Sequence, residues 1–487
     1  MSRARRSRDS QGMNEFVRDA FIGGRWLSGT RRFPVRDPFD DSIVAEVADC
    51  DDAMVDGAII AATRAFPAWR ERPAGDRGKL LCQLAQRMLA DERRLAALCT
   101  RENGKPLKES IAEVRYAASF LSWFGGEAER AYGEVIPASH AHQRLMVTRE
   151  PVGPCALITP WNFPYAMITR KLGAALAAGC TVVAKPAELT PLGTLALARL
   201  CEQVGIPDGV VNIVTTDEAK RVGAKLFASP RIKKVSFTGS TEVGRTILEA
   251  CAHDLKRVSL ELGGNAPFVV LADADLDAAV AGALVAKFRN SGQSCVAANR
   301  FILEAPIAKA FTQKLVAAAG KLVVGRGSEP NVDLGPLIDD RAVDKVRRLV
   351  DDAIDKGARV LRGSRPESGS RLVGPIILDG VTPKMALWRE EIFGPVIALR
   401  TAADETEALA QANDTEYGLV AYVFTRDGAR QTRFAEALET GMVGINEGLV
   451  STAQAPFGGI KHSGLGREGS RHGLEDYTNL KYIAKRI

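Results

Sequence analysis

Long apolar segments and closely spaced cysteine pairs are both missing from this sequence. No apolar run approaches the ~18 residues of a membrane-spanning helix, so we expect no membrane partner. None of the eight cysteines stands in a Cys-x-x-Cys pair, and the five histidines are scattered. We therefore expect no metal site, reduced thiols and a cytoplasmic location. Neither an internal repeat nor a low-complexity tract is present, which excludes a repeat architecture.

A strong charge excess is also missing, except at the N-terminus. The 65 basic and 59 acidic residues give a net charge of +6, and four arginines precede residue 12. This leader lacks the apolar core of a secretory signal. A transit-peptide fragment and a nucleic-acid arm are alternatives, but we predict that residues 1–20 form a disordered basic leader and that nucleic acid is not a partner.

What is present is a chain of ordinary globular composition, with 46% hydrophobic and 25% charged residues. A length of 487 residues predicts two or three domains. From residue 151 onward, short apolar strands alternate with helical segments, which predicts an α/β fold with a parallel sheet. Ligands of such sheets bind beyond the carboxyl ends of the strands.

Other segments have clear local patterns. Residues 53–131 show helical spacing of apolar side chains, and residues 134–150 have the pattern of a polar hairpin. A second alternating region covers 266–446, with amphipathic helices expected at 306–320 and 341–356. A final strand is expected at 479–483.

Cys295 is the first candidate for chemistry. It follows an alanine-rich helical run, residues 276–287, and a polar turn that contains Gly292. Such a position can expose a thiol at the mouth of a cleft. Most free cysteines are instead small buried hydrophobes, so position alone does not assign a catalytic role.

Two glycine-rich stretches could bind a dinucleotide. Residues 464–469 match Gly-x-Gly-x-x-Gly, but no strand, turn and helix surround them, and we reject this match. Residues 237–244, Phe-Thr-Gly-Ser-Thr-Glu-Val-Gly, follow a strand and open a helix. Gly239 allows close backbone approach and Ser240 could bond a phosphate, although a plain helix cap is the alternative.

Three stretches resemble the aldehyde dehydrogenase superfamily when they are taken together and in order. They are Pro-Trp-Asn-Phe-Pro at 160–164, Leu-Glu-Leu-Gly-Gly-Asn-Ala-Pro at 260–267, and the stretch 288–300 around Cys295. The resemblance implies a Rossmann-like coenzyme domain, an α/β catalytic domain and a small β oligomerisation arm that forms homo-dimers or homo-tetramers. It divides the chain into a coenzyme domain (21–133 and 151–261), an arm (134–150 and 470–487) and a catalytic domain (262–469).

The same resemblance implies roles for individual residues. Cys295 is the nucleophile, Asn162 stabilises the oxyanion together with the Cys295 N–H, and Glu261 activates water to hydrolyse the thioester. We expect the thiol of Cys295 to ionise more readily than a free thiol. The coenzyme is NAD, preferred over NADP because Glu188 would repel a 2′-phosphate, and its expected contacts are Trp161, Lys185, Glu188, Gly239, Ser240, Leu262, Glu391 and Phe393.

The substrate motifs resemble the succinate-semialdehyde dehydrogenase branch. Arg170, Arg289 and Ser451 stand where that branch binds the substrate carboxylate, and guanidinium suits carboxylate recognition. Glutarate semialdehyde would suit the same groups. Many branch members carry Cys-x-Cys at the nucleophile, but Ala297 replaces the second cysteine here. We therefore expect no redox-switch disulfide at the nucleophile.

Three alternatives stay open at this point. A broad aldehyde dehydrogenase for uncharged substrates is disfavoured by Arg170 and Arg289. A CoA-acylating enzyme is disfavoured by Glu261, which suits hydrolysis. A binding protein on a retired enzyme fold is disfavoured because Cys295 and its expected partners are intact.

Overall fold

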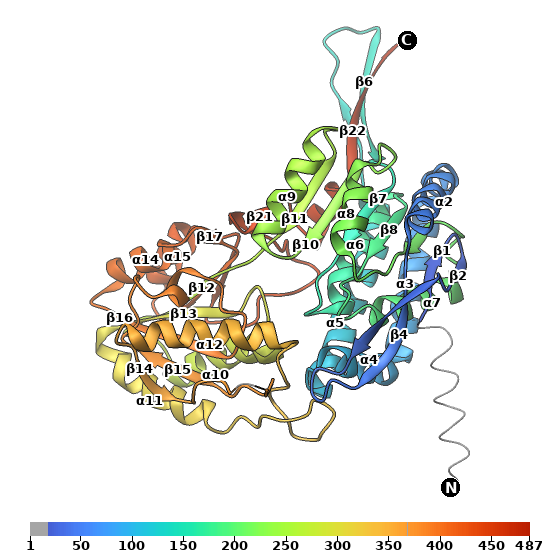
Figure 1. Cartoon of the computed structure of the whole chain (residues 1–487). Helices are drawn as coiled ribbons and strands as arrows, with labels where there is room; N and C mark the ends of the chain where they lie inside the picture. The colour runs from blue at the N-terminus through green and yellow to red at the C-terminus, as the bar shows by residue number, and fades with distance from the viewer. Residues whose placement is uncertain (1–17, 368) are drawn as a thin grey trace.

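A computed structural model describes residues 18–367 and 369–487. The predicted basic leader lies mostly outside these residues, and the chain already enters a strand at Ala20. The molecule has two α/β lobes and a narrow β arm that projects from one of them (Figure 1). The predicted α/β fold with parallel sheets is confirmed.

The first lobe is built on an eight-stranded sheet whose five central strands are parallel. In spatial order the strands are β2 (Arg25–Leu27), β1 (Ala20–Ile22), β9 (Val211–Ile213), β8 (Val182–Lys185), β7 (Cys155–Ile158), β10 (Lys234–Thr238), β11 (Arg257–Glu261) and β21 (Gly464–Leu465). Successive side chains of β7 point to opposite faces of the sheet, so each face packs against its own layer of helices. Leu157 packs into a core with one set of helices and Ala156 into a core on the other face.

Helices cover both faces of this sheet. The core that contains Leu157 is shared with α3 (Ala74–Ala90), α5 (Leu107–Glu127), α6 (Pro164–Ala178) and α7 (Leu192–Gln203). The opposite core is shared with α2 (Asp52–Glu71), α8 (Ala219–Ala228) and α9 (Thr241–Ala252). The predicted helical segment 53–131 is thus four helices, α2 to α5, with α4 at Glu92–Asn103, followed by a short 3-10 turn, η1 (Ala128–Arg130).

The second lobe has a seven-stranded sheet that is parallel except at one edge. Its strands are β14 (Arg359–Arg362), β15 (Ile376–Asp379), β16 (Val396–Ala402), β13 (Ala298–Glu304), β12 (Ala266–Val270), β18 (Val420–Phe424) and β19 (Met442–Ile445). On one face lie α10 (Leu276–Phe288) and α11 (Ala305–Ala319). The other core includes α12 (Asp340–Asp355), α13 (Ala386–Arg389), α14 (Glu405–Asn413) and α15 (Gly428–Ala437).

Two small pairings complete the lobes. The hairpin β3 (Arg31–Arg36) and β4 (Ile43–Asp49) lies near the start of the described chain. The strands β17 (Tyr417–Gly418) and β20 (Ile460–Lys461) pair near its end.

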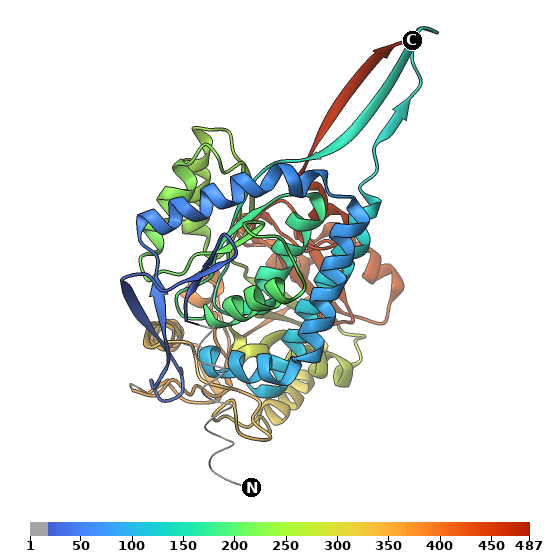
Figure 2. The same cartoon turned by 90° about the vertical axis from the view of Figure 1, so that its right-hand side faces the viewer.

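The arm is a three-stranded antiparallel sheet made by segments far apart in the sequence. It joins β5 (Glu134–Ile136), β6 (Gln143–Pro151) and β22 (Thr478–Arg486). Figure 2 shows these strands standing clear of the body with the C-terminus at the tip. Large apolar side chains are exposed on the arm, including Val135, Leu480 and Tyr482. Assembly of copies through the arm remains a prediction.

The predicted domain limits differ from the structure at two points. Helix α16 (Ser470–Glu475) contacts α5 and α6, so the arm begins at Thr478 and not at residue 470. Strand β21, predicted to lie in the catalytic part, is the edge strand of the first sheet. Among the described residues, no helix has the length and apolar character needed to cross a membrane.

Candidate active site

The carboxyl ends of the parallel strands in the first sheet gather the predicted residues at one edge. β7 leads directly into the loop with Trp161 and Asn162, and β8 ends at Lys185. β10 leads into Gly239, and Glu261 is the last residue of β11. The register pairs Thr238 with Glu261 and Ile158 with Lys185, so these ends are level. This edge is where a parallel sheet binds its ligands.

A cavity of about 390 Å³ opens at this edge and extends across to the second lobe. Trp161 and Phe393 are in edge-to-face contact on its wall, with ring centroids 5.5 Å apart. All but one of the predicted coenzyme contacts line it, and so do two of the three predicted catalytic residues: Trp161, Asn162, Glu188, Gly239, Ser240, Leu262, Cys295, Glu391 and Phe393. Aromatic walls, a helix N-terminus and carboxylates suit a dinucleotide.

Lys185 is the exception, because it lies beside the cavity and is bonded to one of its lining residues. Its ammonium nitrogen is 3.1 Å from a carboxylate oxygen of Glu188, and the Lys185 side chain is buried while that of Glu188 is 39% exposed. Glu188 therefore presents a free carboxylate edge to the cavity. The ammonium group of Lys185 partly balances the negative charge of Glu188.

Helix α9 begins at the cavity, with Ser240 as its N-cap. The Ser240 hydroxyl accepts a hydrogen bond from the Val243 N–H at 3.3 Å. Ser240 therefore caps the helix, which was the predicted alternative to phosphate binding. The two roles are compatible, because the other N–H groups of the first turn still favour an anion at this helix end.

Sequence reasoning missed the part of this cavity that α12 supplies. Asp339, Arg341 and Lys345 line it beside the first-lobe residues. They follow no motif, and more than a hundred residues separate them from Glu188. A basic pair on one turn of a helix would have been the only local signal, and such pairs are common on solvated helices.

A tight turn places Cys295 in the cavity. The 3-10 segment η2 (Arg289–Gly292) has left-handed backbone angles at Asn290, Ser291 and Gly292, which turns the chain sharply before the nucleophile. Gly264 packs against the backbone of Cys295 itself, because a Cβ added to Gly264 would lie 2.5 Å from the carbonyl oxygen of Cys295. Only glycine allows this approach.

The ionisation of Cys295 differs from the sequence expectation. Burial raises the pKa of the Cys295 thiol to about 12, and the carboxylates of Glu391 and Glu261 act in the same direction. Arg170 and Arg289 act to lower it but do not compensate. The expectation of a readily ionised thiol is therefore wrong, because desolvation disfavours the thiolate.

Asn162 is almost fully buried and is held at several atoms. Its amide nitrogen donates to the carbonyl oxygen of Gln293 at 3.1 Å. An Asn side chain has two N–H donors, so one remains for a substrate oxygen. Its main-chain carbonyl accepts hydrogen bonds from Lys105 at 2.6 Å and from Asn290 at 2.9 Å.

Glu261 is almost fully enclosed by the surrounding protein. It is 3% exposed, and neither carboxylate oxygen has a hydrogen-bond partner among the described residues. Burial, reinforced by the nearby Glu468, raises its pKa well above the ordinary value, while Lys171, Arg170 and Arg467 act to lower it. Desolvation thus disfavours the ionised form that a general base requires.

A second, smaller cavity of about 180 Å³ contains two of the three predicted substrate residues. Arg289 and Ser451 line it, together with Tyr116, Phe163, Glu109, Glu113, Ala112 and Leu449. The Arg289 guanidinium lies 5.1 Å from the centre of the Phe163 ring. Asn162 and Phe163 are neighbours in the chain, and one lines each cavity. The loop 161–163 therefore contributes to the walls of both cavities.

Arg170 lies behind this cavity and not on its wall. Its guanidinium donates to the Tyr116 hydroxyl at 2.9 Å and pairs with Glu468 at 3.2 Å. It also lies 4.2 Å from the centre of the Phe457 ring, and only 2% of the residue is exposed. Direct contact between Arg170 and a substrate is not seen in this arrangement and stays a prediction.

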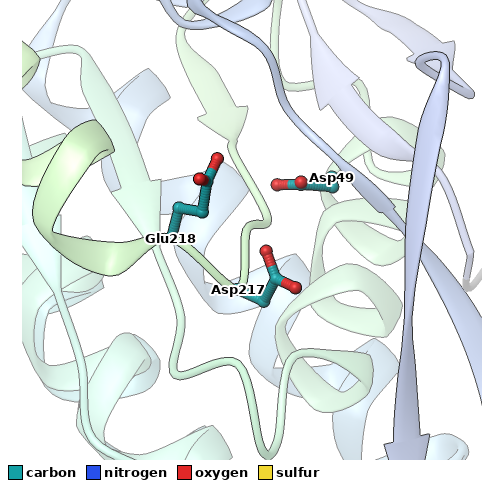
Figure 3. A group of neighbouring side chains, drawn as sticks. All are labelled: Asp49, Asp217 and Glu218. Carbon is teal, nitrogen blue, oxygen red and sulfur yellow. The ribbon is translucent and has the colours of Figure 1, made fainter.

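One group of carboxylates elsewhere has the spacing of a metal site. Figure 3 shows Asp49, Asp217 and Glu218, whose oxygens lie within 4.8 Å of one another. Arg31 is 3.3 Å from Asp49 and 3.7 Å from Glu218, and Arg221 is 2.8 Å from Glu218. These ion pairs explain the cluster without a metal ion.

Comparison with known proteins agrees with this geometry. The profile of the aldehyde dehydrogenase family matches residues 26–483. A glutarate-semialdehyde dehydrogenase of Pseudomonas aeruginosa is 50% identical, over 96% of this chain and 97% of that protein. The NADP⁺-linked succinate-semialdehyde dehydrogenase of Escherichia coli is also 50% identical, over 96% and 98%.

A solved structure extends the likeness to the whole fold. The crystal structure of succinate-semialdehyde dehydrogenase from Burkholderia pseudomallei has a TM-score of 0.95 and 47% identity, and the alignment covers 96% of this chain and 98% of that one. The predicted enzyme class is thereby confirmed. This chain belongs to the aldehyde dehydrogenase family.

Proposed function

We propose that this protein oxidises an aldehyde that carries a carboxylate at its far end, with succinate semialdehyde as the substrate and NAD as the preferred coenzyme. The observation that carries the proposal is the placement of Arg289 and Ser451 in a small cavity beside the loop 161–163, which also contributes to the wall of the cavity of Cys295. A cation and a hydroxyl at the end of a short cavity suit a carboxylate. Relatives named for the succinate and the glutarate semialdehydes are equally similar.

In the first half of the reaction, the Cys295 thiol gives up its proton to water, the sulfur attacks the aldehyde carbon, and the carbonyl oxygen becomes an oxyanion. The free N–H of the Asn162 amide and the Cys295 backbone N–H donate to that oxygen. One such donor contributes roughly 3 kcal/mol to the transition state. The bound coenzyme supplies the hydride acceptor, and a thioester on Cys295 results.

In the second half, Glu261 takes a proton from the water that attacks the thioester. Burial raises the pKa of this carboxyl group above its ordinary value. Gly263 and Gly264 follow it after Leu262 and leave space for the side chain to move. Hydrolysis releases the acid and restores the thiol.

The direct test is a substrate panel. Purified protein should form NADH with succinate semialdehyde at a higher kcat/KM than with an uncharged aldehyde of the same length. Comparing kcat/KM for glutarate semialdehyde with kcat/KM for succinate semialdehyde shows which substrate length the cavity accepts better. Equal values for charged and uncharged substrates would contradict the proposed carboxylate site.

Replacing Arg289 by alanine should raise KM for succinate semialdehyde about ten- to a hundredfold, the equivalent of one charge-assisted contact. KM for the uncharged aldehyde should change little. Arg170→Ala should lower the melting temperature, because it removes one of the two buried cations, Arg170 and Lys171, that pair with Glu468. Equal losses on both substrates in Arg289→Ala would show that Arg289 does not bind the carboxylate.

The coenzyme preference depends on Glu188. A carboxylate there can accept both hydroxyls of the adenosine ribose, and it repels the 2′-phosphate of NADP. Lys185 and the basic α12 residues moderate that repulsion, so we expect a preference and not exclusion. Glu188→Ser should weaken NAD and improve NADP, as measured by the ratio of their kcat/KM values. A wild type that already favours NADP would refute this assignment.

A further inference from the structure

Lys105 is a buried cation that the proposed chemistry does not use. It follows the helix end at Gly104 and is 1% exposed. Its ammonium group lies 4.1 Å from the centre of the Phe163 ring, donates to the carbonyl of Asn162 at 2.6 Å, and pairs with Glu113. Taking an ammonium out of water is costly, so such a residue needs partners that it holds firmly.

Two of the partners of Lys105 lie on the loop that carries the oxyanion donor. Asn162 receives the Lys105 hydrogen bond on its main chain, and Phe163 covers the ammonium group. From the other side, the Asn290 side chain donates to the same carbonyl at 2.9 Å. Asn290 belongs to the turn before Cys295. The peptide of Asn162 is thus fixed between Lys105 and the nucleophile turn.

Glu113 completes the arrangement from helix α5. One of its oxygens pairs with Lys105, and the other accepts the N–H groups of Tyr165 at 2.8 Å and Ala166 at 3.3 Å. Those N–H groups belong to the first turn of α6, directly after the loop. One buried ion pair therefore holds both the loop and the start of the next helix.

We propose that Lys105 is a positioning residue that orients the amide of Asn162 toward the oxyanion. The inference rests on the proposed function, because it requires Asn162 to stabilise that oxygen. Lys105 holds the Asn162 peptide, which fixes where the side chain begins. Oxyanion stabilisation depends on donors that are placed before the reaction, so a shift of this peptide lowers kcat and not substrate affinity.

The test is a double-mutant cycle with Lys105→Met and Asn162→Ala. Asn162→Ala should lower kcat about 10²–10³-fold, and Lys105→Met about tenfold or more through the displaced amide. If Lys105 acts through Asn162, the double variant loses no more kcat than Asn162→Ala alone. Multiplied losses, an unchanged kcat in Lys105→Met, or an unchanged kcat in Asn162→Ala would each overturn the inference.

A second buried lysine provides a matched control. Lys234 is fully buried at the start of β10, bonds Ser259 and lies over the Tyr477 ring, without contact to Asn162. Lys234→Met should lose stability, as Lys105→Met does, but its effect on kcat should be small and should multiply with that of Asn162→Ala. Coupling of Lys234→Met to Asn162→Ala would show that the cycle reports general loosening and would also overturn the inference.

Two further variants keep the test valid if Lys105→Met folds poorly. Lys105→Met combined with Glu113→Gln removes both buried charges, and Lys105→Gln retains a donor for the Asn162 carbonyl. Lys105→Gln should recover part of kcat at an unchanged KM, and no recovery in a folded protein would count against the inference. The proposed function is tested separately by Cys295→Ala, so its failure is distinguishable from failure of the Lys105 inference.

Discussion

Cys295→Ala is expected to lower dehydrogenase turnover at least about a thousandfold, because no other group can form the covalent intermediate. Cys295 is the cysteine that lines the coenzyme cavity, among the described residues. NAD binding and the melting temperature should remain, since the thiol is only half-buried and its replacement removes one atom. NADH formation with succinate semialdehyde and a fluorescence titration with NAD measure the two properties.

Cys82 offers a matched control for this variant. It is the other half-buried cysteine, and it lies on α3 away from the cavities. Cys82→Ala should leave turnover unchanged. Turnover above a few per cent of wild type in Cys295→Ala would refute the assignment of the nucleophile.

The raised pKa of Cys295 gives this residue a pH signature. A thiol with a pKa of about 12 is almost wholly protonated at neutral pH. Its alkylation by iodoacetamide in the coenzyme-free protein should therefore rise about tenfold per pH unit from pH 7 to 10, without a plateau. A plateau below pH 9 would show a thiol that ionises in the ordinary range. Under the proposed function, NAD binds in the same cavity, so protection by NAD should identify the alkylated residue.

The sequence was sufficient for the residues that stand at strand ends. Lys185, Gly239 and Glu261 each close or follow a short apolar run, and parallel strands bring their carboxyl ends to one edge. Their coenzyme cavity could thus be expected from local patterns and the family resemblance together. The helices 306–320 and 341–356 were predicted within one residue of α11 and α12 for the same reason, a clear 3.6-residue period.

The features that could not be predicted from the sequence are those that depend on contacts between distant parts of the chain. Strand β13 was not predicted, because all seven of its residues are buried and no alternation marks it. Arg170 was assigned to the substrate from its motif, but Glu468, almost three hundred residues away, binds it in the fold. The partners of a charged side chain and its desolvation follow from tertiary packing, which is also why the pKa of Cys295 was predicted in the wrong direction.

Glu261→Gln is the prediction with the second largest effect, and its signature is kinetic. The first half of the reaction does not need the carboxylate, so about one NADH per active site should appear in a burst. Hydrolysis needs the base, so steady turnover should fall about 10²–10⁴-fold. Rapid-mixing measurements of NADH resolve the two phases. Mass spectrometry of the quenched protein should find the acyl group on Cys295.

The environment of Glu261 makes glutamine a clean replacement. Neither carboxylate oxygen has a hydrogen-bond partner among the described residues, so the amide removes no hydrogen bond that the fold uses. The melting temperature should therefore stay close to wild type. In the wild type, hydrolysis should quicken as pH rises, because the raised pKa leaves more of Glu261 protonated at low pH, and Glu261→Gln should lose this dependence. Absence of the burst would mean that Glu261 acts before the thioester forms, and would refute its assignment to the hydrolysis step alone.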